Sequence, residues 1–239
     1  MIARKNKQKK LAVLLDPDDM LKRDMSGIID IANRCNSDYF FVGGSTSFQR
    51  PGALISALRD QSNIPVYIFP GNLLQLDNSA DGVLLLSLIS GRNPELLIGN
   101  HVIAAPVLKK MEGEVVPVGY ILVSCGQKTS VEYMSNTDAI PSSKTDIAVA
   151  TAMAGELLGL KMIYLEAGSG AEHPVPSELI SAVKNNISIP LIVGGGLKTA
   201  LDIENAYRSG ADIIVLGNGV INRPSLLEEA CNIRNTLNK

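Results

Sequence analysis

Two glycine-rich turns near the end of the chain have the composition of a phosphate-binding site. Each follows an apolar run: Gly194, Gly195 and Gly196 come after 191–193, and Gly217, Asn218 and Gly219 come after 213–216. Glycine leaves backbone N–H groups open to an anion, because no Cβ blocks the approach. Two such turns after consecutive strands predict a phosphate cradle, and tight turns without a ligand are the alternative. Lys198, just after the first turn, is either a cation for the phosphate or an exposed residue at a helix start.

Asp16 ends another apolar run, 11–15, and is followed by Pro17, Asp18 and Asp19. A carboxylate at a strand end, facing a phosphate cradle, suits Mg²⁺, which takes one or two carboxylates together with substrate phosphates. The alternative is that these acids only complement the dipole of a following helix. We expect that role for Asp18 and Asp19 and favour Asp16 as a metal ligand.

Glu166 ends the run 162–165 and opens the turn Ala167-Gly168-Ser169-Gly170. A glutamate in a partly closed pocket has a raised pKa and can act as a general base. The alternative is a structural ion pair with a lysine. The glycine–serine turn adds possible N–H and hydroxyl donors to the same anion site.

Other familiar catalytic patterns are missing. His101 and His173 have no partner at metal-ligand spacing, which argues against a zinc site. There is also no Gly-x-Ser-x-Gly sequence, so serine hydrolase chemistry has no support.

Apolar runs alternate with helical patterns along the whole chain. The runs that we predict as strands are 11–15, 39–42, 66–69, 83–86, 115–123, 162–166, 191–193 and 213–216. Mostly apolar strands indicate a parallel sheet and predict one (β/α)₈ TIM barrel, with a doubly wound open sheet as the alternative. The polar residues after the strands would then meet at one mouth of the barrel.

Several helices and loops can also be predicted. Only a dozen residues separate Phe69 from Asp81, so the third helix should be short or replaced by irregular structure. The remaining expectations are a helix from Pro17 to about Asn36, a helix after a possible Asn93 cap, a long loop over 126–143, and capping boxes formed by Thr199 with Asp202 and by Ser225 with Glu228.

The bulk properties fit a single domain over residues 1–239 with a basic N-terminal arm, 1–10. A formal net charge of -2 argues against nucleic acid as a partner. Cys35, Cys125 and Cys231 form no disulfide framework, which favours a reducing cytoplasm. No run is long enough to span a membrane, so the basic arm offers at most peripheral contact with one.

The motifs LLDPDD, VGGSTS, YLEAGSGA, VGGGLKT and VLGNGVI together resemble the geranylgeranylglyceryl phosphate synthase family, a family of TIM-barrel prenyltransferases. They extend from residue 14 to residue 221. The resemblance implies that the 3-hydroxyl of sn-glycerol 1-phosphate attacks C1 of geranylgeranyl diphosphate, which releases diphosphate and forms the first ether bond of an ether lipid. It also implies a homo-oligomer, a dimer or a hexamer, of the larger-subunit branch.

The resemblance further implies the site residues. Mg²⁺ would bind Asp16 and Ser45. Glycerol phosphate would bind Tyr164, Leu165, Glu166, Ala167, Gly168, Ser169, Gly170, Gly195, Gly196, Gly217 and Asn218. Leu14 stands where some members carry a lysine, which leaves Lys198 as a candidate cation. The broken third unit would border a groove for the prenyl tail, with Leu73, Leu74, Leu76, Leu86, Leu88 and Ile89 as candidate lining residues or ordinary core.

Two other functions fit the same cradle. A barrel acting on a phosphosugar or a small heterocyclic phosphate would have a small polar pocket and no long apolar groove. A phosphate-binding barrel without catalytic activity is the other, against which the presence of both Asp16 and Glu166 argues.

Overall fold

The computed structural model describes residues 8–19, 24–44, 47 and 49–239. Its strands are β1 (Lys10–Leu15), β2 (Tyr39–Val42), β3 (Val66–Ile68), β4 (Gly82–Leu88), β5 (Glu114–Ser124), β6 (Ile140–Pro141), β7 (Met162–Glu166), β8 (Leu191–Gly194) and β9 (Ile213–Leu216). Its helices are α1 (Ser26–Arg34), α2 (Gly52–Gln61), α3 (Asn100–Leu108), α4 (Ser130–Ser135), α5 (Thr145–Leu157), α6 (Ser177–Asn186), α7 (Ala200–Arg208), α8 (Asn218–Asn222) and α9 (Ser225–Leu237). Two 3₁₀ turns, η1 (Pro17–Asp19) and η2 (Leu73–Gln75), and a π-helical segment, η3 (Glu95–Gly99), complete the elements of the described residues.

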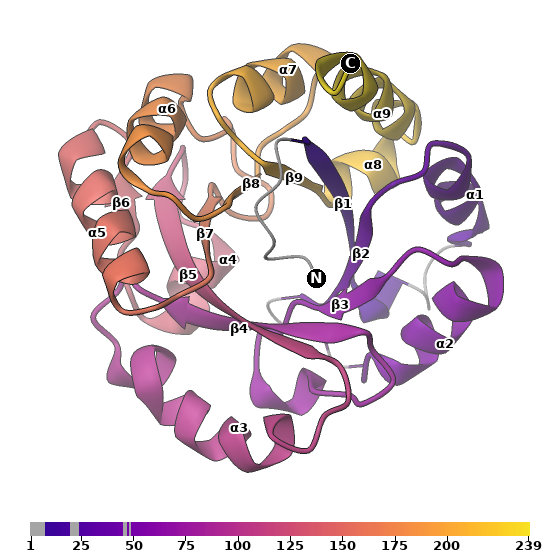
Figure 1. Cartoon of the computed structure of the whole chain (residues 1–239), viewed down its shortest axis with the longest axis horizontal. Coiled ribbons are helices and arrows are strands. Elements are labelled where there is room, and N and C mark those ends of the chain that lie inside the picture. The colour runs from indigo at the N-terminus through magenta and orange to yellow at the C-terminus, as the bar shows by residue number, and fades with distance from the viewer. Residues whose placement is uncertain (1–7, 20–23, 45–46, 48) are drawn as a thin grey trace.

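The strands form a closed parallel barrel inside a ring of helices (Figure 1). The sheet order is β4-β3-β2-β1-β9-β8-β7-β5, and the pairing of β4 with β5 closes the ring. That pairing runs from Gly82 opposite Glu114 to Leu88 opposite Tyr120. The short strand β6 pairs only with the end of β5. The predicted (β/α)₈ barrel is therefore confirmed, and the open sheet is excluded.

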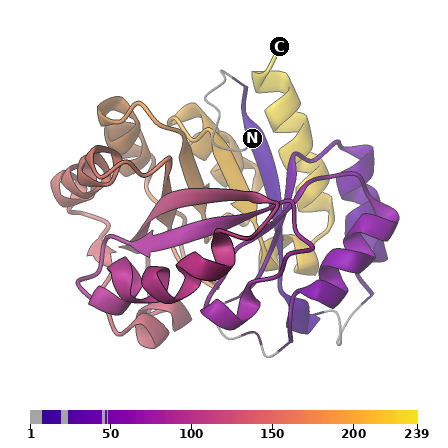
Figure 2. The same ribbon diagram turned by 60° about the horizontal axis from the view of Figure 1, so that its bottom comes forward.

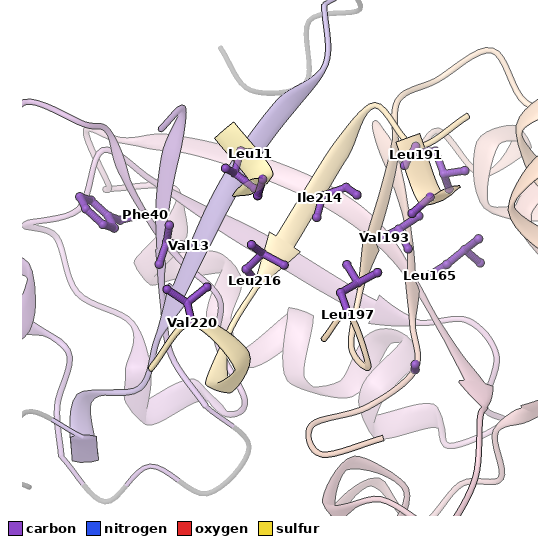
Figure 3. Packing of buried hydrophobic residues seen from close by; sticks show 14 of the residues in the cluster. Leu11, Val13, Phe40, Leu165, Leu191, Val193, Leu197, Ile214, Leu216 and Val220 are labelled. Carbon is purple, nitrogen blue, oxygen red and sulfur yellow. The ribbon is translucent and has the colours of Figure 1, made fainter. Parts of the chain in front are cut away.

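Apolar side chains are buried on both faces of the strands. One layer lies between strands and helices, and Figure 3 shows part of it, including Leu11, Val13, Leu191 and Ile214. The alternating residues of the same strands, such as Ala12 and Ile213, belong to a second cluster that draws almost entirely on strands and fills the barrel interior. This two-sided burial explains why the strands are continuous apolar runs rather than alternating ones.

The ring of helices is incomplete between β3 and β4. Only η2 (Leu73–Gln75) connects these strands, as the short spacing predicted. Asn72 begins this turn by accepting a hydrogen bond from the N–H of Leu74. Figure 2 brings this side of the barrel, with β4 and α3, toward the viewer. Outside the sheet, β4 packs against η3, which continues into α3.

One predicted helix start and one predicted capping box are wrong, although the last helix does begin at Ser225 as predicted. The first helix begins at Ser26, because Asp16 accepts hydrogen bonds from Asp18 through its side chain and from Asp19 through its carbonyl, which closes a separate turn. Met20 and Leu21, expected in its core face, lie outside the described residues. The capping box at Ser225 does not form, since Ser225 is already the first helical residue and Glu228 pairs with Arg34 at 3.0 Å.

Three other predictions of caps and loops agree with the structure wholly or in part. The capping box of Thr199 and Asp202 is present, and the Asn93 side chain accepts a hydrogen bond from the N–H of Glu95. The predicted loop 126–143 contains α4 (Ser130–Ser135), which starts with its own capping box, and β6. No helix of the described residues is long and apolar enough to cross a membrane.

The basic arm is shorter than predicted. Lys10 already belongs to β1, and its ammonium pairs with Asp38 at 2.7 Å. The Lys9 ammonium donates to the carbonyl of Ala211 at 2.7 Å. These two lysines are therefore attached to the N-terminal end of the barrel instead of extending into solvent.

Arg234 joins the last helix to the same end of the barrel. Its guanidinium, 6% exposed, donates to Asp38 at 2.7 Å and to the carbonyls of Asn36 and Cys35 at 2.8 Å each. Asp38 also accepts from the N–H of Leu11. One buried cation thus fixes α9 against β1 and the turn after α1.

Replacing Arg234 with Met should lower the free energy of unfolding by about 3 kcal/mol, because it removes the buried guanidinium that donates to the partly buried Asp38 carboxylate and to two backbone carbonyls. Urea denaturation measures the loss. Arg208→Met is the matched control, since Arg208 also lies in the last turn of a helix but is 62% exposed and pairs only with Glu204. That variant should change stability by no more than about 0.5 kcal/mol. Equal losses in the two variants would contradict this role for Arg234.

Candidate functional site

The polar residues predicted from the sequence gather in one pocket at the C-terminal mouth of the barrel. Asp16, Glu166, Lys198 and Asn218 all line a cavity of about 440 Å³. Tyr164, Gly168, Ser169, Gly170, Gly195, Gly196 and Gly217 line it too. Leu165 and Ala167 do not, and the Leu165 side chain packs outward in the layer beneath the helices. Ser45, predicted as a metal ligand, lies outside the described residues.

Asp16 is placed at the mouth by the turn that follows β1. Its Oδ1 accepts from the N–H of Asp18 at 3.0 Å and from the hydroxyl of Ser47 at 2.8 Å. Its Oδ2 faces Gly44 so closely that a Cβ there would lie 2.1 Å away. A carboxylate oxygen in a cradle that only glycine leaves open is the type of ligand that a hard cation such as Mg²⁺ prefers, so the residues fit this metal.

Glu166 is almost completely buried, with 6% of its surface exposed. Its Oε1 accepts from the N–H of Gly168 at 2.7 Å. Gly195, whose φ of +77° suits glycine, holds the next turn so close that a Cβ would lie 2.3 Å from the same oxygen. Burial raises the pKa of Glu166, and Tyr164 and the Gly168 N–H partly offset that rise. Such an environment suits a general base.

Three aromatic rings stand beside this carboxylate. The ring centroids of Phe69, Tyr120 and Tyr164 are 5.2 to 6.0 Å apart. The Tyr164 hydroxyl is buried and has no hydrogen bond of normal geometry within the described part of the chain, although it lies near enough to Glu166 to lower the pKa of that carboxyl. A buried hydroxyl without a partner at a pocket wall is suited to a substrate oxygen.

The glycine-rich side of the pocket is built from the loops after β7, β8 and β9. The Asn218 amide donates to the hydroxyl of Ser169 at 3.2 Å, which joins the first and last of these loops. The Lys198 ammonium donates to the carbonyl of Glu172 at 3.1 Å. The two glycine turns and the Gly168–Gly170 turn therefore face one another as the sequence predicted.

An apolar groove continues from the polar pocket through the gap in the helical ring. Gly44, Phe69, Tyr120 and Val131 line both cavities, and the groove has a volume of about 350 Å³. Its wall includes four of the six predicted residues: Leu73, Leu76, Leu86 and Leu88. The other two do not line the groove: Leu74 is 79% exposed, which contradicts both of its predicted roles, whereas Ile89 packs against the core, the alternative predicted for it, and lines a different cavity beside α5.

His101, in the wall of the groove, forms a polar pair with Ser87. His101 Nε2 and the Ser87 hydroxyl are 2.9 Å apart, and burial lowers the pKa of His101. This shift favours the neutral imidazole, which is compatible with an apolar ligand. Within the described residues, no group of three or more His, Cys, Asp or Glu side chains is arranged to hold a metal.

Sequence reasoning missed several lining residues. Phe69, Tyr120 and Val131 are apolar, and nothing in their local sequence separates pocket walls from ordinary core. Arg223 also lines the polar pocket. Its position directly after the VLGNGVIN segment was the available indication, because short turns that follow a phosphate loop stay close to the ligand.

Comparisons with known proteins agree with this geometry. A family model described as the PcrB family matches residues 4–234. "Geranylgeranylglyceryl phosphate synthase" of Spirosoma linguale is 45% identical over 97% of this chain and 94% of its own, and the protein of that name from Thermococcus sibiricus is 38% identical over 99% and 93%. The crystal structure of (S)-3-O-geranylgeranylglyceryl phosphate synthase from Thermoplasma acidophilum in complex with sn-glycerol-1-phosphate has a TM-score of 0.86 and 28% identity, covering 97% of this chain and 94% of that one.

The raised pKa of Glu166 gives stability a predictable pH dependence. The folded state protonates this carboxyl more readily than the unfolded chain, so its contribution to stability is present below the unfolded pKa and is lost as pH rises through the folded pKa. Glu166→Gln keeps an acceptor for the Gly168 N–H but never ionises. Its gain in unfolding free energy over the wild type should therefore be larger at about pH 8 than at about pH 4. Urea denaturation at both pH values measures this, and an equal difference at both would contradict it.

Proposed function

Since the chain belongs to the PcrB family, we propose that it is a geranylgeranylglyceryl phosphate synthase. This prenyltransferase joins the 3-hydroxyl of sn-glycerol 1-phosphate to C1 of geranylgeranyl diphosphate and releases diphosphate. The relatives named above, over nearly their whole length, support this assignment.

The observation that carries the proposal is the union of two unlike cavities. The polar pocket has two carboxylates and three phosphate-type turns, and it opens into an apolar groove past Phe69 and Tyr120. A substrate pair with charged head groups and one long hydrocarbon chain needs both cavities side by side. An enzyme that acts on small phosphosugars or heterocyclic phosphates does not require an apolar groove. A phosphate-binding protein without catalytic activity does not require a buried, poorly solvated glutamate.

The residues divide the reaction between them. The turns after β7, β8 and β9 hold the phosphate of sn-glycerol 1-phosphate, and the neighbouring Glu166 receives the proton of the 3-hydroxyl. The bond from that oxygen to C1 forms as the bond from C1 to the diphosphate oxygen breaks. The faces of Phe69, Tyr120 and Tyr164 border the point where positive charge develops on C1, and aromatic faces stabilise cations. The groove holds the tail and excludes water from C1.

Asp16 is the residue that would hold Mg²⁺, with Ser45 as the second predicted ligand. When bound, the metal supplies positive charge for the departing diphosphate. The exposed cradle of Asp16 Oδ2 and Gly44 supports this assignment.

The proposal includes a homo-oligomer in the cytoplasm. Large apolar side chains are exposed on η3, on α3, and on the neighbouring α5 and the residue that follows it: Ile98, Val102, Ile103, Val107, Ile147, Met153, Leu157 and Leu158. Monomers rarely expose so many apolar residues together, so this face suits contact with a second copy. The three cysteines are free thiols, which suits a reducing compartment.

The function is tested by incubating the chain with labelled sn-glycerol 1-phosphate, Mg²⁺ and prenyl diphosphates of several lengths. We expect a lipid-soluble labelled phosphate, formed fastest with the geranylgeranyl donor. If no donor yields such a product, the chain is not this enzyme.

Asp16→Asn should lower Mg²⁺-dependent turnover by roughly 100-fold, because the amide keeps the hydrogen bond from Asp18 but loses the charge that binds the metal. Turnover over a range of Mg²⁺ concentrations measures the effect, and an unchanged thermal midpoint serves as the folding control. Wild-type turnover in this variant would remove Asp16 from the metal site.

Val102→Lys should reduce the particle mass in solution, because it places a charge in the apolar face of α3. Light scattering after size exclusion measures the mass. Leu201→Lys on α7 is the matched control, since Leu201 is 64% exposed and Val102 is 65% exposed. Equal masses for the wild type and both variants would show that this face is not the subunit contact.

A further inference from the structure

The polar pocket must bind anionic groups although two carboxylates already line it. A phosphate and a diphosphate must bind near Asp16 and Glu166, and like charges at short range repel strongly in a poorly solvated site. Backbone N–H groups help but carry no net charge. Among the described residues that line this pocket, the cationic side chains are Lys198 and Arg223. The question is which of them serves the glycerol phosphate.

Lys198 is already engaged with the protein. Its ammonium donates to the carbonyl of Glu172, in the loop between β7 and α6. Its backbone N–H donates to Asp202, which also accepts from Thr199 in the capping box. These contacts attach Lys198 to the start of α7 and to the neighbouring loop, a role in shaping the pocket wall.

Arg223 lies close in sequence to the last glycine turn. It follows α8 (Asn218–Asn222), and its backbone N–H donates to the carbonyl of Gly219 at 3.0 Å. Its own carbonyl accepts from the N–H of Leu226 at 3.0 Å, at the start of α9. The backbone of Arg223 is thus fixed relative to Gly217 and Asn218.

The guanidinium of Arg223 is also oriented. One of its terminal nitrogens, Nη2, donates to Glu229 Oε2 at 2.9 Å, and about half of the side chain is exposed. A guanidinium has five N–H donors in a planar fork, so this ion pair leaves donors for a second anion. A fork held by one carboxylate can bind a phosphate with two parallel hydrogen bonds, which a lysine cannot do.

We propose that Arg223 is the cation that binds the phosphate of sn-glycerol 1-phosphate, and that Glu229 is the positioning residue that orients it. This inference rests on the proposed function and names a binding residue for it. The dianionic phosphate then bridges the glycine turns and the Arg223 fork, on the side of the pocket away from the groove. Arg223 therefore selects a phosphorylated glycerol and leaves the prenyl diphosphate to the opposite side.

The test compares Arg223→Gln with Lys198→Gln. Each variant is assayed with sn-glycerol 1-phosphate varied at saturating geranylgeranyl diphosphate, and then with the two substrates exchanged. Arg223→Gln should raise the KM for glycerol phosphate roughly tenfold or more, while the KM for the prenyl donor changes less than about twofold. Lys198→Gln should raise the KM for glycerol phosphate by less than about threefold. A larger effect from Lys198→Gln, or none from Arg223→Gln, would overturn the assignment.

Two further variants separate charge from positioning. Arg223→Lys should recover only part of the lost affinity, because it restores the charge without the fork. Glu229→Gln should raise the same KM by a smaller factor than Arg223→Gln. Glu229→Gln acting more strongly than Arg223→Gln, or Arg223→Lys recovering all of the affinity, would contradict the proposed division of roles. Thermal midpoints within about 2 °C of wild type confirm folding of these exposed-site variants.

A binding measurement separates this inference from the function itself. Calorimetric titration with sn-glycerol 1-phosphate alone, without donor, needs no turnover. Weaker binding by Arg223→Gln than by Lys198→Gln supports the role of Arg223 even if the wild type forms no lipid product, an outcome that would refute only the prenyltransferase. Equal binding by the wild type and Arg223→Gln refutes the role of Arg223 whether or not the enzyme is active.

Discussion

The pairing of β4 with β5 is the constraint on which the rest of the structure depends. A parallel barrel needs a continuous ring of backbone hydrogen bonds, and here one connecting helix of the outer ring is missing. The paired stretch of β4 and β5 covers seven residues of each strand, from Gly82 and Glu114 to Leu88 and Tyr120, whereas β3 pairs with β4 over only two. The long pairing closes the ring at the place where the helical cover is thinnest. The groove between β4, η2 and α3 can therefore stay open without opening the barrel.

The apolar groove and the raised pKa of Glu166 have one physical cause. Apolar walls that accept a hydrocarbon chain also exclude water, and exclusion of water is what raises the pKa of Glu166 and of the neighbouring Tyr120 and Tyr164. A carboxylate in that setting is a stronger proton acceptor than one in water, and the fold bears the energetic cost of keeping it there. The hydrogen bond from the Gly168 N–H and the close backbone of Gly195 keep the carboxylate in place against that cost.

The sequence predicted the barrel, the missing helix and most of the polar pocket, because these depend on local patterns. Apolar runs mark strands that are buried on both faces, and glycines after them mark turns whose backbone must stay accessible. The errors have equally local causes. The helix predicted from Pro17 does not start there, because the side chain of Asp16 closes a separate turn. The capping box predicted for Ser225 and Glu228 does not form, because Glu228 pairs with Arg34 instead. The apolar wall of the site could not be told apart from the core. Phe69 and Tyr120 differ from core residues only because one side of each aromatic ring borders a cavity.

The order of the strands decides how the polar pocket and the apolar groove are arranged around the mouth of the barrel. The mouth has two sectors. In the first, β7, β8 and β9 carry the glycine turns, and in the second, β2, β3, β4 and β5 border the groove. The strand β1, which ends before Asp16, lies between the two sectors. Tyr120 and Tyr164 lie beside Glu166 on the opposite side of the barrel from β1, where β5 pairs with β7 and the two sectors meet again. Under the proposed function, the phosphate of one substrate would lie in the first sector and the hydrocarbon tail of the other in the second, so that their reactive ends meet between Asp16 and Glu166. The carboxylate proposed to bind the metal and the proposed base would then act from opposite sides of the bond being formed, as the departure of diphosphate on one side and of a proton on the other requires.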